Sequence, residues 1–310
     1  MNVARIKAYA KVNITLEITG VENGFHMLDS LVTTVDLFDL IVLKKRKDKL
    51  CSVMMHGLGS EQIPPEKNNA LKAAEAFSAR FGTCGADITV HKNIPMGAGL
   101  GGSSADVAGV LQGMAKLYKI DDENALGEIA DSLGSDTRYM LKGGFMRMQG
   151  RGNVLSPTHI SKKLYMLLIC PPTDVSTSAC YKTYDELPKT LQWRESATEN
   201  CIALLEKGNV NEGGRYATNE LFPSALHLND DVRIAYEQAC SFSPISACMT
   251  GSGSCVFALF ETKELCEWAK SRYKGKFRTL TVQTVNPQAL KNAKKWRNPF
   301  ALSQEEIEGE

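Results

Sequence analysis

The sequence lacks the features that mark several large classes of protein. It has no apolar run near the roughly 20 residues that a membrane span needs. Residues 1–10 hold no long apolar stretch or small-residue cleavage site of the kind that a secretory signal carries. The formal net charge is +1, from 36 Lys plus Arg against 35 Asp plus Glu, whereas a general nucleic-acid binder carries a basic excess. We therefore expect a cytoplasmic protein that binds no membrane and no nucleic acid.

Closely spaced cysteines are also missing. The nine cysteines are odd in number and widely scattered, without a CxxC pair. A zinc site or a secreted disulfide framework would need tighter spacing. We interpret the cysteines as buried free thiols in a reducing cytoplasm. Because 43% of the residues are hydrophobic, the core needs no metal or disulfide to hold it together.

Length and periodicity predict two domains of mixed structure, since 310 residues exceed the usual size of one compact core. The apolar patterns predict strands at 12–18, 35–43, 50–55, 86–91, 143–149, 164–170, 245–249, 255–260 and 279–282. They predict helices at 70–81, 103–118, 124–133, 197–206, 231–241 and 263–273, with Asn69 as the cap of the first. Because neighbouring strands often resemble hairpins, an α+β fold fits better than a doubly wound sheet.

The same patterns suggest where the domains divide. We place an N-terminal domain at residues 1–160, a C-terminal domain at 161–287 and a polar tail at 288–310. The tail is basic at 291–297 and acidic at 305–310, a composition typical of disorder. A docking helix is the alternative for this tail.

The most informative stretch is NIPMGAGLGGSSADVAGVL, at residues 93–111, between a predicted strand and a predicted helix. Its glycines let backbone N–H groups face one point and let a polyanion approach, while the helix directs its positive end there. No Lys follows as in the Walker pattern, and no Rossmann fingerprint is present. We predict a phosphate-binding loop, with a plain flexible loop as the alternative. Its residues are Pro95, Met96, Gly97, Ala98, Gly99, Leu100, Gly101, Gly102, Ser103 and Ser104.

A second glycine-rich turn, MTGSGSCVF at residues 249–257, is by itself as consistent with a plain hairpin as with a binding site. Together with the first loop it suggests two backbone surfaces on either side of one ligand. We assign Gly251 in this turn to the substrate site.

Three blocks in order resemble the GHMP kinase superfamily, which includes galactokinase, homoserine kinase and mevalonate kinase. They are AYAKVNITLEI at 8–18, PMGAGLGGSSADVA at 95–108 and the turn at 249–257. The resemblance covers about residues 5–282. It implies an α+β, two-domain fold, with a ribosomal-protein-like N-terminal domain and a ferredoxin-like C-terminal domain. It also implies an ATP-dependent small-molecule kinase with Mg2+, in which ATP lies over the loop and the substrate lies between the domains.

Shorter motifs favour one branch of that superfamily, which phosphorylates a cytidine-diphosphate-linked sugar alcohol in non-mevalonate isoprenoid biosynthesis. The motifs are GFHML at 24–28, GSD at 134–136, VST at 175–177 and NEL at 219–221. A kinase of the homoserine or mevalonate type, or a catalytically altered homologue, is the alternative. The sequence leaves open whether the protein is a monomer or a homodimer.

The resemblance also assigns roles to single residues. It implies that Asp136 accepts the proton of the substrate hydroxyl, and that the ammonium of Lys11 offsets charge on the phosphoryl oxygens. Without the resemblance, Asp136 would be read as a helix cap and Lys11 as a solvated side chain. Asn13, on the same strand face as Lys11, would donate a hydrogen bond to the substrate.

A further set of residues is expected to bind cytosine. His26 would read the edge of the base, Phe25 and Tyr181 would enclose its faces, and Thr177 would supply a hydroxyl nearby. The chain departs from the family pattern at Ala105, where GLGGGSSDAA would place a serine, so the hydroxyl that serves phosphate or magnesium is open. It departs again at Thr137-Arg138, where Arg138 is expected to put a cation beside the proposed base, either to bind phosphate or as a sign of altered substrate choice.

Overall fold

The computed structural model describes residues 2–188 and 195–286, so the predicted tail lies outside the described residues. The first of two sheets follows the order β4-β5-β3-β2-β9, while β1 and β6 also pair with β3, and β7 pairs with β6. Its strands are β1 (Val3–Asn13), β2 (Thr15–Glu22), β3 (Phe25–Lys45), β4 (Ser52–His56), β5 (Ala86–His91), β6 (Met146–Gly150), β7 (Val154–Pro157) and β9 (Thr218–Asn219).

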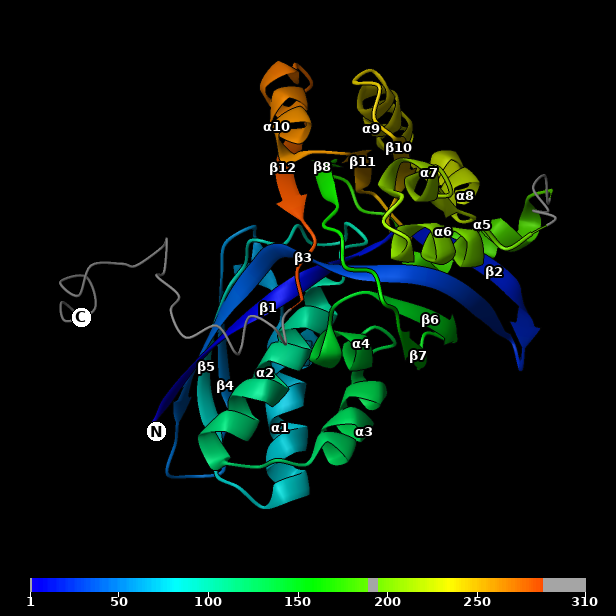
Figure 1. The fold of residues 1–310 in the computed structure, drawn as a ribbon. Helices are drawn as coiled ribbons and strands as arrows, with labels where there is room; N and C mark the ends of the chain where they lie inside the picture. Colours follow the sequence, from blue (N-terminus) through cyan, green and yellow to red (C-terminus); the bar gives the residue numbers. More distant parts are fainter. Residues whose placement is uncertain (1, 189–194, 287–310) are drawn as a thin grey trace.

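Strand β3 organises this sheet. It is 21 residues long and crosses the middle of the molecule, from β5 at one end to β2 at the other (Figure 1). The sequence predicted only its second half. The reason is that residues 29–35 are buried on both faces, and such a stretch shows no alternation of apolar and polar side chains.

The second sheet contains β8 (Tyr165–Cys170), β10 (Ser246–Met249), β11 (Val256–Phe260) and β12 (Arg278–Gln283). Its order is β10-β11-β8-β12, and all three pairings are antiparallel. Numbered in chain order, this is 2-3-1-4 with helices in the two crossovers, which is the ferredoxin-like arrangement. The predicted α+β class and the ferredoxin-like second half are confirmed.

Helices pack against both sheets. Figure 1 shows α1, α2 and α3 beneath the first sheet, and α9 and α10 beside the second. The helices are α1 (Asn69–Phe81), α2 (Gly102–Tyr118), α3 (Glu123–Leu133), α4 (Thr137–Lys142), α5 (Thr177–Glu186), α6 (Ala197–Glu206), α7 (Val210–Gly214), α8 (Phe222–Leu228), α9 (Asp230–Cys240) and α10 (Lys263–Arg272).

Two details of the helices differ from the sequence predictions. The cap of α1 is Asn68, not Asn69, because the Asn68 side chain accepts hydrogen bonds from the backbone of Ala70 and Leu71. Helices α4, α5, α7 and α8 were not predicted. Three of them, α4, α7 and α8, are 5 to 7 residues long, too short to show a clear apolar period.

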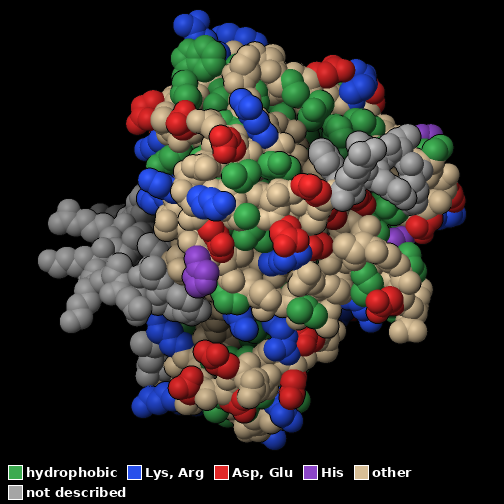
Figure 2. All heavy atoms as spheres, turned by 45° about the vertical axis from the view of Figure 1, so that its right-hand side comes forward, with side chains coloured by type: hydrophobic (Ala, Val, Ile, Leu, Met, Phe, Trp, Pro, Cys, Tyr) green, Lys and Arg blue, Asp and Glu red, His purple; other side chains and the backbone are tan. Residues whose placement is uncertain are grey.

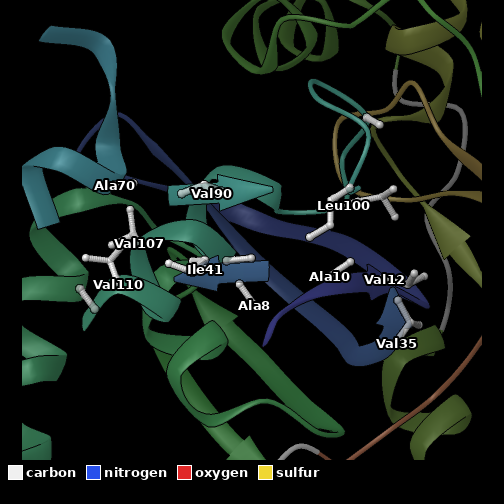
Figure 3. Close-up of a cluster of buried hydrophobic side chains, with 14 of the residues drawn as sticks. Ala8, Ala10, Val12, Val35, Ile41, Ala70, Val90, Leu100, Val107 and Val110 are labelled. Atoms are coloured by element: carbon white, nitrogen blue, oxygen red, sulfur yellow. The ribbon is translucent and has the colours of Figure 1, made fainter. Parts of the chain in front are cut away.

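The core beneath the predicted loop is built from small side chains. Ala8, Ala10 and Val12 of β1 belong to one buried cluster with Val107 and Val110 of α2. Figure 3 shows Ala8 nearer the two valines of α2, and Ala10 and Val12 nearer Leu100. Leu100 of the loop belongs to the same cluster and is 1% exposed. The glycine-rich loop is therefore anchored to the core by one of its own side chains.

The surface and the helices agree with the bulk composition. On the face shown in Figure 2, acidic and basic side chains of the described residues are interspersed, without a large area of one sign. Within the same part of the chain, no helix is both long and apolar enough to cross a membrane. Six of the nine cysteines are buried, and Cys240 is exposed.

We expect Tyr139→Phe to destabilise the fold by about 1–3 kcal/mol, because it removes a buried hydrogen-bonding group. The Tyr139 side chain is inaccessible, its hydroxyl donates to the Gly144 carbonyl at 2.7 Å, and it lies 2.9 Å from the Thr34 hydroxyl. Denaturant unfolding measures the loss. In the control Tyr9→Phe, the hydroxyl removed has no hydrogen bond among the described residues. Equal losses in the two variants would contradict the assignment.

Candidate active site

The chemistry-bearing side chains gather around a cavity of about 420 Å3. All ten predicted loop residues line it, and so do Lys11, Asp136, Thr177 and Gly251. A larger groove of about 870 Å3 lies between α3, α4 and the segment after β12, but it contains none of the predicted site residues. We place the candidate active site in the smaller cavity because the reactive groups converge there.

The loop has the conformation that its glycines predict. Gly99 and Gly101 have φ values of +74° and +70°, in the left-handed region that favours glycine. A Cβ on Gly99 would lie 2.1 Å from the Thr250 carbonyl oxygen, so no side chain fits there. Gly101 is also the N-cap residue of α2, and the positive end of that helix therefore starts directly at the loop.

The second glycine-rich turn packs directly against the first loop. The backbone N–H of Cys255 donates to the Ala98 carbonyl at 3.3 Å, and the Thr250 hydroxyl donates to the Gly99 carbonyl at 3.4 Å. From β9, the Asn219 amide donates to the carbonyls of Met249 and Gly251, both at 2.8 Å. The two turns, which the sequence predicted to lie on either side of one ligand, are thus in direct contact with each other, and Asn219 holds the second turn in place.

Lys11 and Asp136 meet at this cavity. Their side chains are 3.3 Å apart, and they are 6% and 27% exposed. The backbone N–H of Lys11 donates to the Leu100 carbonyl at 3.0 Å, which joins strand β1 to the loop. The register of β1 against β3 shifts between Tyr9 and Lys11, and a bulge of this kind redirects the side chains that follow it.

Asp136 occupies the N-cap position of α4 but makes no capping hydrogen bond with its side chain. Its carboxylate is therefore left for Lys11, and the helix-cap alternative does not describe it. The guanidinium of Arg138 forms a bidentate pair with Asp131, at 2.7 and 2.6 Å, and lines the larger groove. The expectation that Arg138 puts a cation beside the base is wrong, because Asp131 of α3 binds the Arg138 guanidinium.

Asn13 has an internal role in this structure. Its side-chain oxygen accepts a hydrogen bond from the Lys11 ammonium, and its amide donates to the Ser30 hydroxyl at 2.8 Å. It is 3% exposed and does not line the cavity. Asn13 therefore holds the Lys11 side chain in place, and its predicted hydrogen bond to the substrate stays a prediction.

Two of the predicted cytosine residues, His26 and Tyr181, are in contact with each other outside the cavity lining. The His26 ring stacks on Tyr181 with centroids 4.8 Å apart, and its Nε2 lies 2.8 Å from an Asp185 carboxylate oxygen. Phe25 is 48% exposed, and Arg151 lies 3.5 Å from its ring centroid. Tyr181 therefore stacks on His26, and the predicted enclosure of a base between Tyr181 and Phe25 stays a prediction.

Two observations link this contact to the cavity. Burial raises the pKa of Tyr181, and the negative charge of Asp136 raises it further, which places that hydroxyl within the field of the carboxylate. Thr177 begins α5, four residues before Tyr181, and its hydroxyl lies 2.9 Å from that of Ser252 in the second turn. Helix α5 therefore reaches from the second glycine-rich turn to the contact between His26 and Tyr181.

Sequence reasoning missed a buried charge cluster under the loop. The Lys92 ammonium lies 2.5 Å from an Asp39 carboxylate oxygen and 2.6 Å from one of Asp106, and all three side chains are at most 5% exposed. Burial raises the pKa of Asp106, against the opposing effect of Lys92. Burial lowers the pKa of Lys92, but the charges of Asp106 and Asp39 outweigh it, so the net shift is upward. The signal in the sequence was Asp39, a charged residue inside an apolar strand. Because burying an unpaired charge is too costly, such a residue predicts a buried cation as its partner.

The far end of the cavity was also not predicted. It is lined by Met55, Ile63 and Asn68, which precede or begin α1. There the Asn69 amide donates to the Ser103 hydroxyl at 3.1 Å. Met55 and Ile63 thus add apolar side chains to a cavity that is otherwise lined largely by the glycine-rich loop.

This fold and this site agree with what known proteins show. The family model described as GHMP kinases N terminal domain matches residues 68–146, and the one described as GHMP kinases C terminal matches residues 201–275. The first match includes the whole loop and Asp136, and the second includes the second glycine-rich turn. The class is therefore a GHMP kinase, an ATP-dependent small-molecule kinase.

Curated relatives narrow the class. The chain is 34% identical to the 4-diphosphocytidyl-2-C-methyl-D-erythritol kinase of Clostridium beijerinckii, over 90% of this chain and 100% of that protein. It is 32% identical to the kinase of the same name from Caldicellulosiruptor saccharolyticus, over 90% of this chain and 96% of the relative. A crystal structure of 4-(cytidine 5'-diphospho)-2C-methyl-D-erythritol kinase shares the fold, with a TM-score of 0.75 at 24% identity over 91% of this chain and 100% of that one. The chain belongs to this family of GHMP kinases.

We expect Gly99→Ala to abolish nucleotide binding while the protein stays folded, because the added Cβ would collide with the Thr250 carbonyl and separate the two turns. Titration with a non-hydrolysable ATP analogue measures binding, and circular dichroism reports the fold. The control is Gly82→Ala, whose φ of +64° carries a similar backbone cost but has nothing within 4 Å of the new Cβ. Wild-type affinity in Gly99→Ala would show that the loop does not hold the nucleotide.

Proposed function

We propose that the protein phosphorylates the methylerythritol 2-hydroxyl of 4-diphosphocytidyl-2-C-methyl-D-erythritol with ATP, in non-mevalonate isoprenoid biosynthesis. The observation that carries the chemistry is the Lys11–Asp136 pair, 3.3 Å apart beside the glycine-rich loop. The names of the relatives, which align over nearly their whole length, support the choice of substrate. The buried thiols support a reducing cytoplasm as the compartment.

In this proposal the triphosphate lies over residues 97–104. Backbone N–H groups of the loop and the positive end of α2 bind its oxygens. The adenine then lies near Met55, Ile63 and Asn68. A cavity of about 420 Å3 is within the usual size range for small-molecule sites.

The phosphoryl transfer uses few protein groups. As the substrate oxygen attacks the γ-phosphorus, its proton passes to the Asp136 carboxylate and the bond to the ADP oxygen breaks. In a loose transition state the proton leaves late, so correct placement of the carboxylate matters more than its basicity. Lys11 offsets the charge on the phosphoryl oxygens, and Asn13 holds its ammonium in position.

The residues present fit a magnesium ion that arrives with the nucleotide. Among the described residues there is no group of three or more His, Cys, Asp or Glu side chains that would form a metal cage. Mg2+ needs no such cage, because it takes most of its ligands from phosphates and water. The hydroxyl of Ser104 and the carboxylate of Asp136 line the cavity and can hold it, whereas the Ser103 hydroxyl already accepts from Asn69. When bound, the ion would neutralise phosphate charge.

The cluster around His26 supports a substrate that carries a base. His26, Tyr181 and Phe25 have no evident use for a small acceptor such as homoserine or mevalonate. Thr177 and Gly251 line the cavity, and Thr177 lies on the same helix as Tyr181. The acceptor would therefore extend from the cavity to the contact between His26 and Tyr181. We assign these residues to substrate binding.

We expect Asp136→Asn to lower kcat by about 10²–10⁴-fold, the usual contribution of a general base, with ATP-analogue binding retained. A coupled ADP assay with the cytidyl substrate measures turnover. The matched control Asp131→Asn alters a nearby carboxylate whose only described role is to bind Arg138. Unchanged turnover in Asp136→Asn would refute the base assignment.

We expect 4-diphosphocytidyl-2-C-methyl-D-erythritol to be consumed in an ATP-dependent assay, and to raise the melting temperature as a specific ligand does. Homoserine and mevalonate serve as the comparison acceptors. His26→Ala should raise KM for the cytidyl substrate by about tenfold, equivalent to one lost hydrogen-bonding contact, and leave KM for ATP unchanged. Turnover of homoserine or mevalonate in place of the cytidyl compound would overturn the proposed substrate.

A further inference from the structure

The buried charges Asp39, Lys92 and Asp106 connect the two ends of the glycine-rich loop. Lys92 directly follows β5, where the chain enters the loop, and Asp106 lies in the first turns of α2, where the chain leaves it. Asp39 belongs to β3, the long strand on which both segments rest. The three side chains therefore come from three separate elements that meet beneath the loop.

Both carboxylate oxygens of Asp39 accept hydrogen bonds from the start of the loop. One of its carboxylate oxygens accepts from the backbone N–H groups of Asn93 and Ile94, at 2.6 and 2.9 Å. The other accepts from the Lys92 ammonium at 2.5 Å. Through that ammonium the connection continues to Asp106 at 2.6 Å. The entry and the exit of the loop are thus tied to a single carboxylate of the sheet.

The second oxygen of Asp106 shows what this side chain does. It is buried and has no hydrogen-bond partner, so the one described hydrogen bond of the carboxylate is to Lys92. A carboxylate kept only for stability would be expected to use both oxygens, because an unpaired buried acceptor is costly. Well-packed apolar residues would stabilise this place at least as well as buried charges do.

Lys92 and Asp106 also form part of the cavity lining, under Gly102. A Cβ on Gly102 would lie 3.5 Å from the Lys92 ammonium nitrogen. The cluster is therefore in contact with the segment of the loop that begins α2. A change in its geometry would move the backbone N–H groups directed into the cavity.

We propose that Asp39, Lys92 and Asp106 are positioning residues that fix the distance between the two ends of the phosphate loop and so set its affinity for ATP. This inference rests on the proposed placement of ATP at the loop. The three residues act through the loop backbone, and none of them transfers a proton or contacts the acceptor.

The test compares Asp106→Leu with Asp106→Asn. Both remove the same negative charge, and both leave Lys92 paired with Asp39, so no unpaired cation remains. Only the Asn amide oxygen can still accept from Lys92. We expect Asp106→Leu to weaken binding of a non-hydrolysable ATP analogue by about tenfold or more, since small displacements of a preorganised site have effects of this size. The loss in Asp106→Asn should be several times smaller, and KM for the acceptor should not change in either variant.

A stability control separates positioning from folding. Gln112 lies on the same helix, and its amide donates to the Leu141 carbonyl at 3.0 Å, away from the cavity. Gln112→Leu should lower the melting temperature without weakening the binding of the ATP analogue. If Asp106→Leu binds the analogue like the wild type, or if the Leu and Asn variants lose affinity equally, the inference is overturned.

A second variant keeps the test valid if Asp106→Leu fails to fold. In Asp39→Asn the amide oxygen can still accept from the backbone of residues 93 and 94, but the amide nitrogen cannot accept from Lys92. We expect the same selective loss of ATP-analogue affinity, and wild-type affinity would contradict us. Failure of the wild type to bind the analogue, or binding that Gly99→Ala leaves intact, would instead reject the proposed ATP placement.

Discussion

A backbone carbonyl occupies the space that a side chain at Gly99 would need, and much of the site depends on this contact. Because the Thr250 oxygen lies there, the loop between β5 and α2 and the turn between β10 and β11 are in direct backbone contact. Elements more than 150 residues apart thus form one surface. Lys11 joins it through the backbone hydrogen bond to Leu100, so strand β1 adopts its position relative to both.

Charge is arranged in two layers around this backbone surface. In the cavity, Lys11 faces Asp136, and one of the pair is partly open to solvent, as a group that meets a substrate must be. Below the cavity, Lys92 and its two carboxylates are almost wholly buried. Buried ionic groups are poor sources of stability but have strict geometry. The lower layer therefore suits a role in placing the loop, and the upper layer suits chemistry.

The parts of the fold that sequence predicted best are those where one face of an element is buried. Helices α1 and α3 and strand β5 show clear periodicity, so their bounds were close to the observed ones. Residues 29–35 of β3 gave no such signal, since they are buried on both faces. Short helices such as α4 depend on the tertiary structure around them, because an isolated turn is only marginally stable.

The sequence by itself determined the glycine-rich loop, the second turn and the class of kinase, because these depend on residue types at fixed local spacing. It did not determine which side chains meet. Only the tertiary structure decided that Arg138 binds Asp131, that Asn13 supports Lys11, that His26 stacks on Tyr181, and that Asp39 reaches Lys92. The physical reason is that such contacts join residues whose separation along the chain carries no information about their distance in space. Strand register, a bulge before Lys11 and the crossing of two sheets set those distances.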